Sequence, residues 1–394
     1  MKNKAMLKVS ILLASMMTMM ANAVIAPALP QIREVFSAVQ GAEVLSKLLM
    51  TLPALTIAIT APFVGRLVDK RGRLRVLMFS LILYALAGTS GLWLNSLPAI
   101  LVGRLFLGLG VAGIMTTATT LIGDYFEGED RNAFMGLQGA FIGLGGVVFI
   151  TTSGYLADIH WRLPFVIYAF SLLVLVLSVS FLYEPEIKKK TEGKGGDQDY
   201  SMKTVWVIFI SGFLGLSYFY IIPVQIPFFI QSFEGVSNAM TGWAISSLTA
   251  TSAMAALSYK YMKKRFSYPT IYGISFLIMA TGYILLSLCN TYMQVIAVIL
   301  WMGIGTGWLM PNSSLWIMSV VPESVRGRMI GRLTTFIFMG QFASPLFIQP
   351  LQNWFGLKGA FAFSGGTMIL FAAIFIFMLQ EKQKPGVLPR SEPA

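Results

Sequence analysis

The sequence contains few charged residues for its length. Asp, Glu, Lys and Arg make up 12% of its 394 residues, against about 25% in soluble globular proteins. So few charges leave no polar coat for a water-facing surface, which excludes a soluble enzyme or a soluble nucleic-acid reader. The net charge of +12 would suit a nucleic-acid partner only as a single patch, and here it is divided among short clusters between apolar runs.

Cysteine and histidine each occur once. Cys289 lies in an apolar run, where it can form neither an intrachain disulfide nor a thiolate metal cage. His160 lies in a short polar loop and has no second histidine with which to share a metal ion. All 17 acidic residues fall in loops, tails or the ends of apolar runs, and no nucleophile there has a base beside it. We therefore expect no enzyme, no metal site and no other cofactor.

Apolar residues are abundant, at 56% of the chain. A hydrocarbon layer of about 30 Å needs about 20 helical residues to cross it, and twelve runs of that kind can be identified. They cover residues 7–32, 46–66, 76–95, 98–123, 133–157, 164–182, 205–231, 239–259, 268–288, 292–320, 329–351 and 359–380. The first run imitates a signal peptide because Ala21-Asn22-Ala23 resembles a cleavage site, but it continues to Leu29, which favours a retained span.

The positive charges are distributed unequally between the two sides of the predicted bundle. The side with the N-terminus, the even-numbered loops and the C-terminus holds 24 of the 29 Lys and Arg residues. The opposite side holds Arg33, Lys47, Arg162 and Lys358. Because loops rich in Lys and Arg stay in the cytoplasm, we expect a multi-pass protein of the cell membrane, plasma or inner, with both termini cytoplasmic.

A single long polar segment separates the sixth and seventh runs. Its Gly, Lys and Glu content is typical of a flexible cytoplasmic linker. We therefore expect a six-helix bundle at residues 1–183, a linker at 184–204, a second six-helix bundle at 205–381 and a cytoplasmic tail at 382–394.

The two predicted bundles are similar to each other in sequence. A shift of 195 residues places Gly108, Gly110, Met115, Arg131 and Gly136 on Gly303, Gly305, Met310, Arg326 and Gly331. Matches without a gap indicate an internal duplication. The predicted fold is an all-α integral membrane protein in which a pseudo-twofold axis along the membrane normal relates two six-helix bundles, with a central site between them.

Several motifs resemble those of one transporter family. The loop Gly65–Arg75 resembles the G-x-x-x-D-R-x-G-R signature of the major facilitator superfamily. Residues 104–112 are similar to the R-x-x-Q-G-x-G-x-A pattern of its proton-coupled members, with Leu107 in place of Gln. Residues 321–328 and 340–345 are similar to segments of the drug/proton antiporter branch. The resemblance covers residues 10–380 and implies the major facilitator fold and transport by alternating access.

The fifth apolar run departs from the antiporter pattern. The G-x-x-x-G-P-x-x-G-G signature should fall on Gly145–Gly154, but Phe149-Ile150 replaces the Gly-Pro pair and Ser153 precedes the last glycine. The remaining glycines of this run favour close helix packing at least as strongly as an antiport-specific role.

The resemblance also implies a conformational switch at the cytoplasmic side. Asp69 and Arg73 are four residues apart, a spacing that allows an ion pair on a helical turn. The family pattern links the arginine to an acid that corresponds to Asp124, and the aspartate to the beginning of the eleventh span, where a helix dipole favours an anion. The full set of expected switch residues is Gly65, Asp69, Arg73, Asp124, Arg131 and Arg326. Alternatively, these are ordinary charges of a cytoplasmic loop.

Arg104 is the sole strong charge within a predicted span. Burial of a charge in the membrane is costly, so Arg104 either faces a cavity with a partner or is a packing or snorkelling residue. No acid lies near the middle of any span. Proton coupling would therefore have to work through Glu34 or through Arg104 and its neighbours, or be absent.

Polar side chains at helical spacing suggest a substrate cavity. In this family the first, fourth, seventh and tenth spans line the cavity, and in the tenth span Trp308, Asn312 and Trp316 recur at i, i+4 and i+8. The predicted cavity residues are Asn22, Arg104, Thr117, Gln138, Tyr218, Gln225, Trp308, Asn312, Trp316 and Gln341. Any of them could instead join helices. Amide, indole and phenol groups with one cation suit an amphipathic organic molecule better than a bare metal ion.

These patterns favour a secondary active transporter that exports a small amphipathic compound by proton antiport, such as a drug or a secreted metabolite like a siderophore. A facilitator or importer of a neutral or anionic metabolite is the main alternative. A membrane enzyme or lipid-handling protein, with Arg104 bound to a phosphate head group, is a third. The expected partners are a small molecule, the lipid bilayer and protons, with no nucleic acid, and we expect a monomer.

Overall fold

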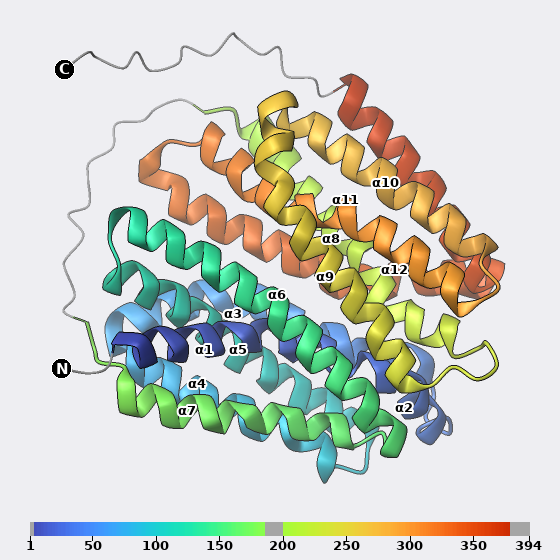
Figure 1. The fold of residues 1–394 in the computed structure, drawn as a ribbon, viewed down its shortest axis with the longest axis horizontal. Coiled ribbons are helices and arrows are strands. Elements are labelled where there is room, and N and C mark those ends of the chain that lie inside the picture. The colour runs from blue at the N-terminus through green and yellow to red at the C-terminus, as the bar shows by residue number, and fades with distance from the viewer. Residues whose placement is uncertain (1–3, 186–199, 379–394) are drawn as a thin grey trace.

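The computed structural model describes residues 4–185 and 200–378, and this part of the chain is helical and contains no strand (Figure 1). The helices are α1 (Lys4–Ala23), α2 (Leu29–Val35), α3 (Ala42–Arg71), α4 (Arg73–Gly88), α5 (Leu97–Tyr125), α6 (Gly128–Ile159), α7 (Phe170–Phe181), α8 (Met202–Ile230), α9 (Asn238–Arg265), α10 (Tyr268–Leu288), α11 (Tyr292–Val320) and α12 (Glu323–Ala373). The shorter elements are η1 (Ala26–Ala28), η2 (Thr89–Leu92), η3 (Leu163–Ala169) and η4 (Ile374–Met378). The predicted all-α membrane fold is thus confirmed.

Local sequence explains where several helices begin. Five helices follow a Ser or Thr whose side-chain oxygen accepts an otherwise unpaired backbone N–H of the first turn. These residues are Ser96, Ser201, Ser237, Ser267 and Thr291. At Thr291 the side chain of Gln294 returns the bond, which completes a capping box.

Ten helices in the described residues are long and apolar enough to cross a membrane. Two details relate this number to the twelve predicted runs. The candidate at Val325–Phe377 contains two helices, because α12 breaks at Gly356, whose φ of 68° is a left-handed conformation that favours glycine. Helix α9 has 28 residues, enough to cross, but its many Ser and Thr residues make it less apolar.

The helices form two halves that lie side by side. Helices α1–α7 (blue to green) make one half and α8–α12 (yellow-green to red) the other (Figure 1). The most extensive contacts between the halves join α3 to α12 and α6 to α9. The predicted linker lies partly, and the predicted tail wholly, outside the described residues.

Glycines allow α6 and α9 to approach closely. A Cβ atom on Gly154 would lie 2.6 Å from the carbonyl oxygen of Asn238, and one on Gly242 would lie 2.9 Å from that of Ile150. On another face of α6, a Cβ on Gly145 would lie 2.9 Å from Cβ of Met16 in α1. Gly145 and Gly154 of the fifth predicted span, with Gly242 of the eighth, therefore allow this close helix packing.

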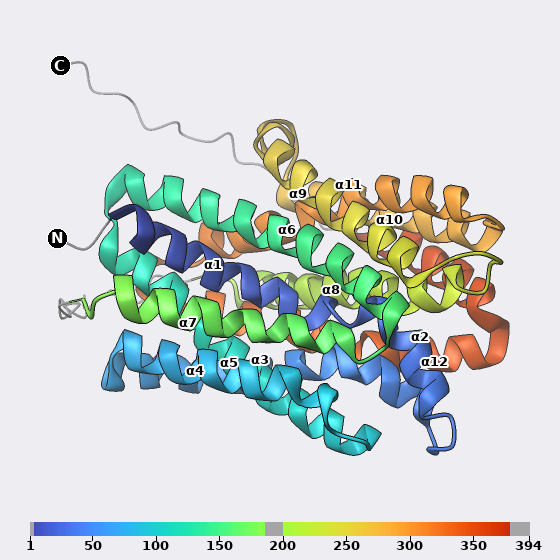
Figure 2. The same ribbon diagram turned by 60° about the horizontal axis from the view of Figure 1, so that its bottom comes forward.

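The two ends of the bundle can be distinguished. Helix α1 begins and α7 ends at one end, which the charge pattern predicts to be cytoplasmic, while α2 and the loop to α3 lie at the other end (Figure 1, Figure 2). We refer to them as the predicted cytoplasmic end and the predicted outer end.

Candidate functional site: a central cavity between the two halves

A cavity of about 440 Å³ lies between the two halves. Helices α1, α5 and α6 supply one wall, and α8, α9, α11 and α12 supply the other. None of the described residues that line it is charged. The wall is mainly apolar, with Met19, Met115 and Met310 as adaptable side chains and Phe219, Tyr220 and Phe338 as flat ones.

Some polar groups in the wall are bonded to one another. Gln138 donates from Nε2 to Oγ of Ser15 at 2.9 Å, which joins α6 to α1. Ser252 and Thr306 share a hydrogen bond of 2.6 Å between their hydroxyl oxygens, which joins α9 to α11. These groups are satisfied within each half and therefore shape the wall.

Two other polar groups in the wall have no hydrogen-bond partner in the described part of the chain. They are Oδ1 of Asn22 and Nε2 of Gln341, on side chains that are 3% and 1% exposed. A buried polar atom without a partner costs about 1–3 kcal/mol. One amide from each half thus offers an acceptor and a donor to a molecule in the cavity.

Asn22, Gln138 and Gln341 are the three predicted cavity residues that line this space. The i, i+4, i+8 stripe of α11, formed by Trp308, Asn312 and Trp316, does not line the cavity. Trp308 donates from Nε1 to the carbonyl oxygen of Ala255 at 3.0 Å, and Trp316 stacks on Tyr268 with ring centroids 6.0 Å apart.

Asn312, between the two tryptophans, also bonds to neighbouring helices. Its Oδ1 accepts from the Tyr259 hydroxyl at 2.9 Å, and its Nδ2 donates to the carbonyl oxygen of Tyr268 at 3.0 Å. The i, i+4, i+8 stripe therefore packs α11 against α9 and α10. The cavity face of α11 is the one that carries Thr306 and Met310.

The remaining predicted cavity residues are also outside its lining. Tyr218 bonds to Thr367 at 2.8 Å and lines a separate pocket of about 310 Å³ within the second half. Thr117 and Gln225 are fully buried. Hydrophobic spacing does not show how far each helix is rotated about its own axis, so these positions could not be distinguished from Asn22 in the sequence.

Arg104 is fully buried inside the first half, outside the cavity lining. Its Nε donates to the carbonyl oxygen of Leu49 at 3.0 Å and its Nη2 to the Tyr168 hydroxyl at 2.7 Å. The guanidinium lies 4.9 Å from the Tyr168 ring centroid and 5.5 Å from that of Phe165. These bonds and aromatic faces offset part of the cost of the buried charge.

The contacts of Arg104 extend to the cavity helix α1. The same Tyr168 hydroxyl donates to the carbonyl oxygen of Ala21 at 3.0 Å, next to Asn22. Glu34 is exposed on α2, and no hydrogen bond or ion pair joins it to Arg104 in the described residues.

The predicted switch residues are partly brought together at the predicted cytoplasmic end. Arg73 lies 2.9 Å from Asp124, measured from Nε to Oδ2, and 3.7 Å from Asp69, measured from Nη2 to Oδ1. The Asp69 side chain is 74% exposed, and within the described residues it makes no bond to α12. Gly65 lies in α3, Arg131 is exposed in the first turn of α6, and Arg326 lies near the beginning of α12.

Glu184 also belongs to this cluster, although the sequence placed it only at the beginning of the linker. Its two carboxylate oxygens accept the backbone N–H groups of Arg73 and Leu74 at 2.6 and 2.9 Å. The glutamate therefore caps the first turn of α4, after the turn at Gly72 with its φ of 93°.

Lys47 is a second residue whose place could not be predicted, since the sequence showed only an outer positive charge. It is fully buried near the beginning of α3. Its Nζ donates to Gln349 Oε1 at 2.7 Å, to Gln352 Oε1 at 2.8 Å and to Glu43 Oε1 at 3.2 Å. Both glutamines belong to α12, so this cluster joins the two halves at the predicted outer end.

Further contacts close the same end. The Asp158 carboxylate accepts the backbone N–H groups of Asn238 and Ala239 at 2.7 and 3.1 Å, so an acid of α6 caps α9. Gln231 donates to the carbonyl oxygen of Pro27 at 3.2 Å. Among the described residues, the polar contacts between the halves thus gather toward the predicted outer end.

Proteins with known functions resemble this chain over most of its length. It is 28% identical over 310 residues to the tetracycline resistance protein, class D, of Salmonella ordonez, which covers 76% of this chain and 77% of that one. It is 24% identical over 313 residues to the quinolone resistance protein NorA of Staphylococcus aureus strain COL, which covers 76% and 78% of the two chains.

Solved structures share the fold. A bacterial homolog of the human lysosomal transporter Spinster, inward-facing and occupied, superimposes with a TM-score of 0.78 at 18% identity, over 95% of this chain and 96% of that one. A D-xylose-proton symporter superimposes with a TM-score of 0.79 at 16% identity, over 94% and 96%.

The family itself is identified by a sequence model. The sequence model described as Major Facilitator Superfamily matches residues 11–235 and 207–394 of this chain. These two matched ranges cover both halves of the fold and every helix that lines the cavity. The chain therefore belongs to the major facilitator superfamily of membrane transporters, as its motifs predicted, and it is not an enzyme.

Proposed function

We propose that this transporter exports a small amphipathic organic compound by alternating access, driven by proton antiport. The observation that carries the proposal is the central cavity, which lies between the halves and whose described lining is uncharged. The polar contacts between the halves gather toward the predicted outer end. Its volume of about 440 Å³ lies within the range of about 300–1,000 Å³ that drug-sized ligands occupy.

The chemistry of the wall defines the substrate class. Aromatic and methionine side chains suit a flat apolar body, and the free groups of Asn22 and Gln341 suit one polar edge that both donates and accepts. Arg104 bonds within the first half, so the cavity wall offers no cation to an anionic group. The names of the two resistance proteins are consistent with such cargo.

The contacts also favour alternating access. The polar contacts between the halves gather toward the predicted outer end, which favours an inward-facing arrangement. To face outward, the Lys47 cluster would separate, and the exposed Asp69 would reach the beginning of α12, where helix N–H groups favour an anion.

We propose three candidate places for proton coupling, namely Glu34, Arg104 and the ion pair of Glu43 with Lys47. Glu34 and Arg104, which the sequence suggested, are not bonded to each other, so they would have to act separately. Glu43 and Lys47 form an ion pair at 3.2 Å within the cluster that joins the halves. Protonation of Glu43 would remove that ion pair and weaken the outer closure, which links a proton to the conformational change.

A second candidate function is a facilitator or importer of a neutral metabolite. It is favoured by the absence of any acid among the described residues of the cavity lining. Proton antiport and facilitation differ in one measurable respect, because only the former moves protons when substrate is added.

The test uses the purified protein in vesicles that are acidic inside and contain a pH-sensitive dye. A quinolone or a tetracycline should release protons from the vesicles, while D-xylose should not. Antiport of an amphipathic compound would be contradicted if D-xylose released protons and neither drug did. It would also be contradicted if a drug crossed the membrane without release of protons.

A pair of variants tests the site itself. Replacement of both Asn22 and Gln341 by Ala should weaken substrate binding about tenfold, because each neutral hydrogen bond contributes about 0.5–1.5 kcal/mol. Asn312→Ala is the matched control: it removes an amide that bonds within the second half, so it should lower thermal stability and leave affinity unchanged. Equal affinity in all three proteins would exclude this cavity wall as the binding site.

A further inference from the structure

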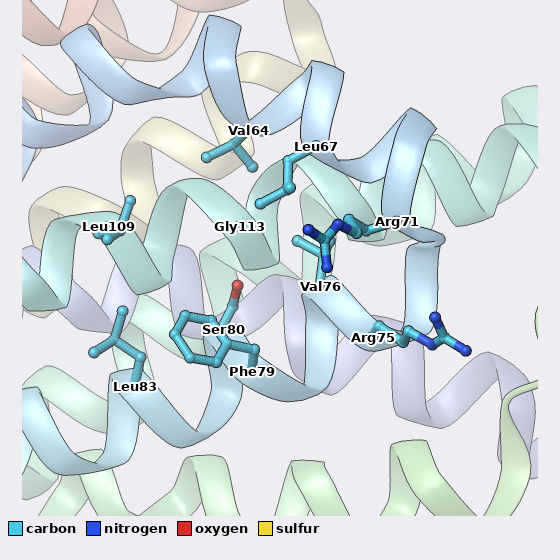
Figure 3. Close-up of a pocket in the computed structure, with 10 residues that line it drawn as sticks. All are labelled: Val64, Leu67, Arg71, Arg75, Val76, Phe79, Ser80, Leu83, Leu109 and Gly113. Carbon is cyan, nitrogen blue, oxygen red and sulfur yellow. The ribbon is translucent and has the colours of Figure 1, made fainter.

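A groove of about 380 Å³ lies on the first half, apart from the central cavity. Helices α3 and α4 form its sides and α5 forms its floor (Figure 3). The apolar part of its lining is Val64, Leu67, Val76, Phe79, Leu83 and Leu109. Leu67 and Phe79 are 46% and 65% exposed, so the groove is open at the surface of the bundle.

A glycine and a serine shape the middle of this groove. A Cβ on Gly113 of α5 would lie 1.9 Å from Oγ of Ser80 in α4. These small residues bring α4 and α5 together, and both line the groove. Its depth therefore depends on the close packing of the two helices.

Two arginines complete the lining at one end, the predicted cytoplasmic end. Arg71 ends α3 and Arg75 lies in the first turn of α4, so they lie on either side of the turn at Gly72. Figure 3 shows Arg71 extended back over the groove and Arg75 at the same end, with its guanidinium directed away from the groove. Both are exposed.

The nearby acids have other partners. Asp69 is paired with Arg73 at 3.7 Å, and Glu184 accepts backbone N–H groups of α4. Within the described residues, neither Arg71 nor Arg75 forms an ion pair. Two exposed guanidinium groups thus lie at the end of an apolar groove without an internal counter-charge.

We infer that this groove binds one anionic phospholipid of the cytoplasmic leaflet. An acyl chain would lie along Leu67, Phe79 and Leu83, and the phosphate would lie between the two arginines. Arg binds phosphate through a planar fork of donors, and basic pockets between membrane helices on the cytoplasmic side bind anionic headgroups. The bound lipid would lie against the turn that joins the switch residues of α3 and α4.

The test measures which lipids stay bound to the purified full-length protein after mild delipidation, by native mass spectrometry. The wild type should retain phosphatidylglycerol in preference to phosphatidylcholine. Replacement of both Arg71 and Arg75 by Gln should reduce that preference on the order of thirtyfold, the effect expected from two Lys or Arg contacts at the membrane surface.

Two further variants keep the result specific. Lys264→Gln with Arg265→Gln removes the same charge from the corresponding turn of the second half, and should leave the preference unchanged. Leu67→Trp fills the groove but keeps both arginines, and should reduce retention of phosphatidylglycerol in protein that still elutes as the wild type does.

Three outcomes would overturn the inference. The first is equal retention of the two lipids by the wild type, and the second is an equal loss of preference in the control pair. The third is displacement of the lipid by millimolar glycerol phosphate, which would indicate a simple phosphate site without a role for the acyl groove.

Discussion

At the predicted outer end, buried side chains of one half bond to the other half, while at the predicted cytoplasmic end they bond within their own half. Lys47 of α3 reaches two glutamines of α12, whereas Arg73, just beyond the far end of α3, bonds to Asp124 of the same half. Under the proposed alternating access, contacts of the first kind would hold the outer end closed, while contacts of the second kind would leave the cytoplasmic end able to open. A transporter that alternates should exchange these two kinds of contact.

Orientation has the largest consequence for this comparison, because it decides which end is which. Reporter domains fused after residue 192 and after residue 383 should both be active in the cytoplasm, since 24 of the 29 Lys and Arg residues were assigned to that side. Activity of either fusion outside the cell would reverse the labels of the two ends.

Asp69→Asn should have the next largest effect. Only a carboxylate can serve both Arg73 and the positive end of the α12 helix dipole, so the outward-facing state would lose its cytoplasmic closure. Substrate flux in vesicles should fall by about two orders of magnitude, which corresponds to about 2.8 kcal/mol, at unchanged expression. Asp130→Asn, another exposed acid at the same end, is the control. Normal flux in Asp69→Asn would show that the motif is only a charged loop.

Lys47→Met should weaken the outer closure. It removes charge-assisted bonds across the halves, each worth about 1.5–3 kcal/mol, but it also removes the cost of a buried charge. We therefore expect the equilibrium between the two conformations to shift about tenfold toward the outward-open state. The shift can be followed by the alkylation rate of a cysteine introduced in place of Gln225, in a Cys289→Ala background.

The control for Lys47 lies at the same end. Lys358→Gln breaks a 2.7 Å bond to Asn290 within the second half, so it should leave the alkylation rate unchanged. If both lysine variants alter the rate equally, the Lys47 cluster has no special role between the halves.

Arg104 should give the smallest effect on binding. Arg104 lies outside the cavity lining, so Arg104→Lys should change substrate affinity less than about threefold. Because Arg104 supports α1 through Tyr168, the same variant should lower the free energy of unfolding by about 1–3 kcal/mol, the cost of an unsatisfied buried group. If Arg104→Lys strongly weakened the binding of anionic substrates but not of neutral ones, Arg104 would contact the substrate. If the pH profile of transport became flat, Arg104 would take part in proton coupling.

The cluster around Arg73 shows which parts of a site can be predicted from sequence. Asp69 lies one helical turn away, and the motif placed Asp124 beside the same guanidinium, so local geometry and family pattern were sufficient. The cavity was different: Asn22 and Asn312 have the same chemistry, yet one faces the cavity and the other joins α11 to its neighbours. Their roles depend on helix rotation.

The sequence by itself determined the twelve apolar runs, the duplication and the family, because length, composition and short motifs are local properties. The rotation of each helix, the burial of Lys47 and the enclosure of Arg104 by aromatic rings were decided only by the tertiary structure. The physical reason is the solvent. A helix surrounded by lipid and by other helices is apolar on every side, so its sequence carries no periodic signal for the inner face, and the contacts with neighbouring helices decide it.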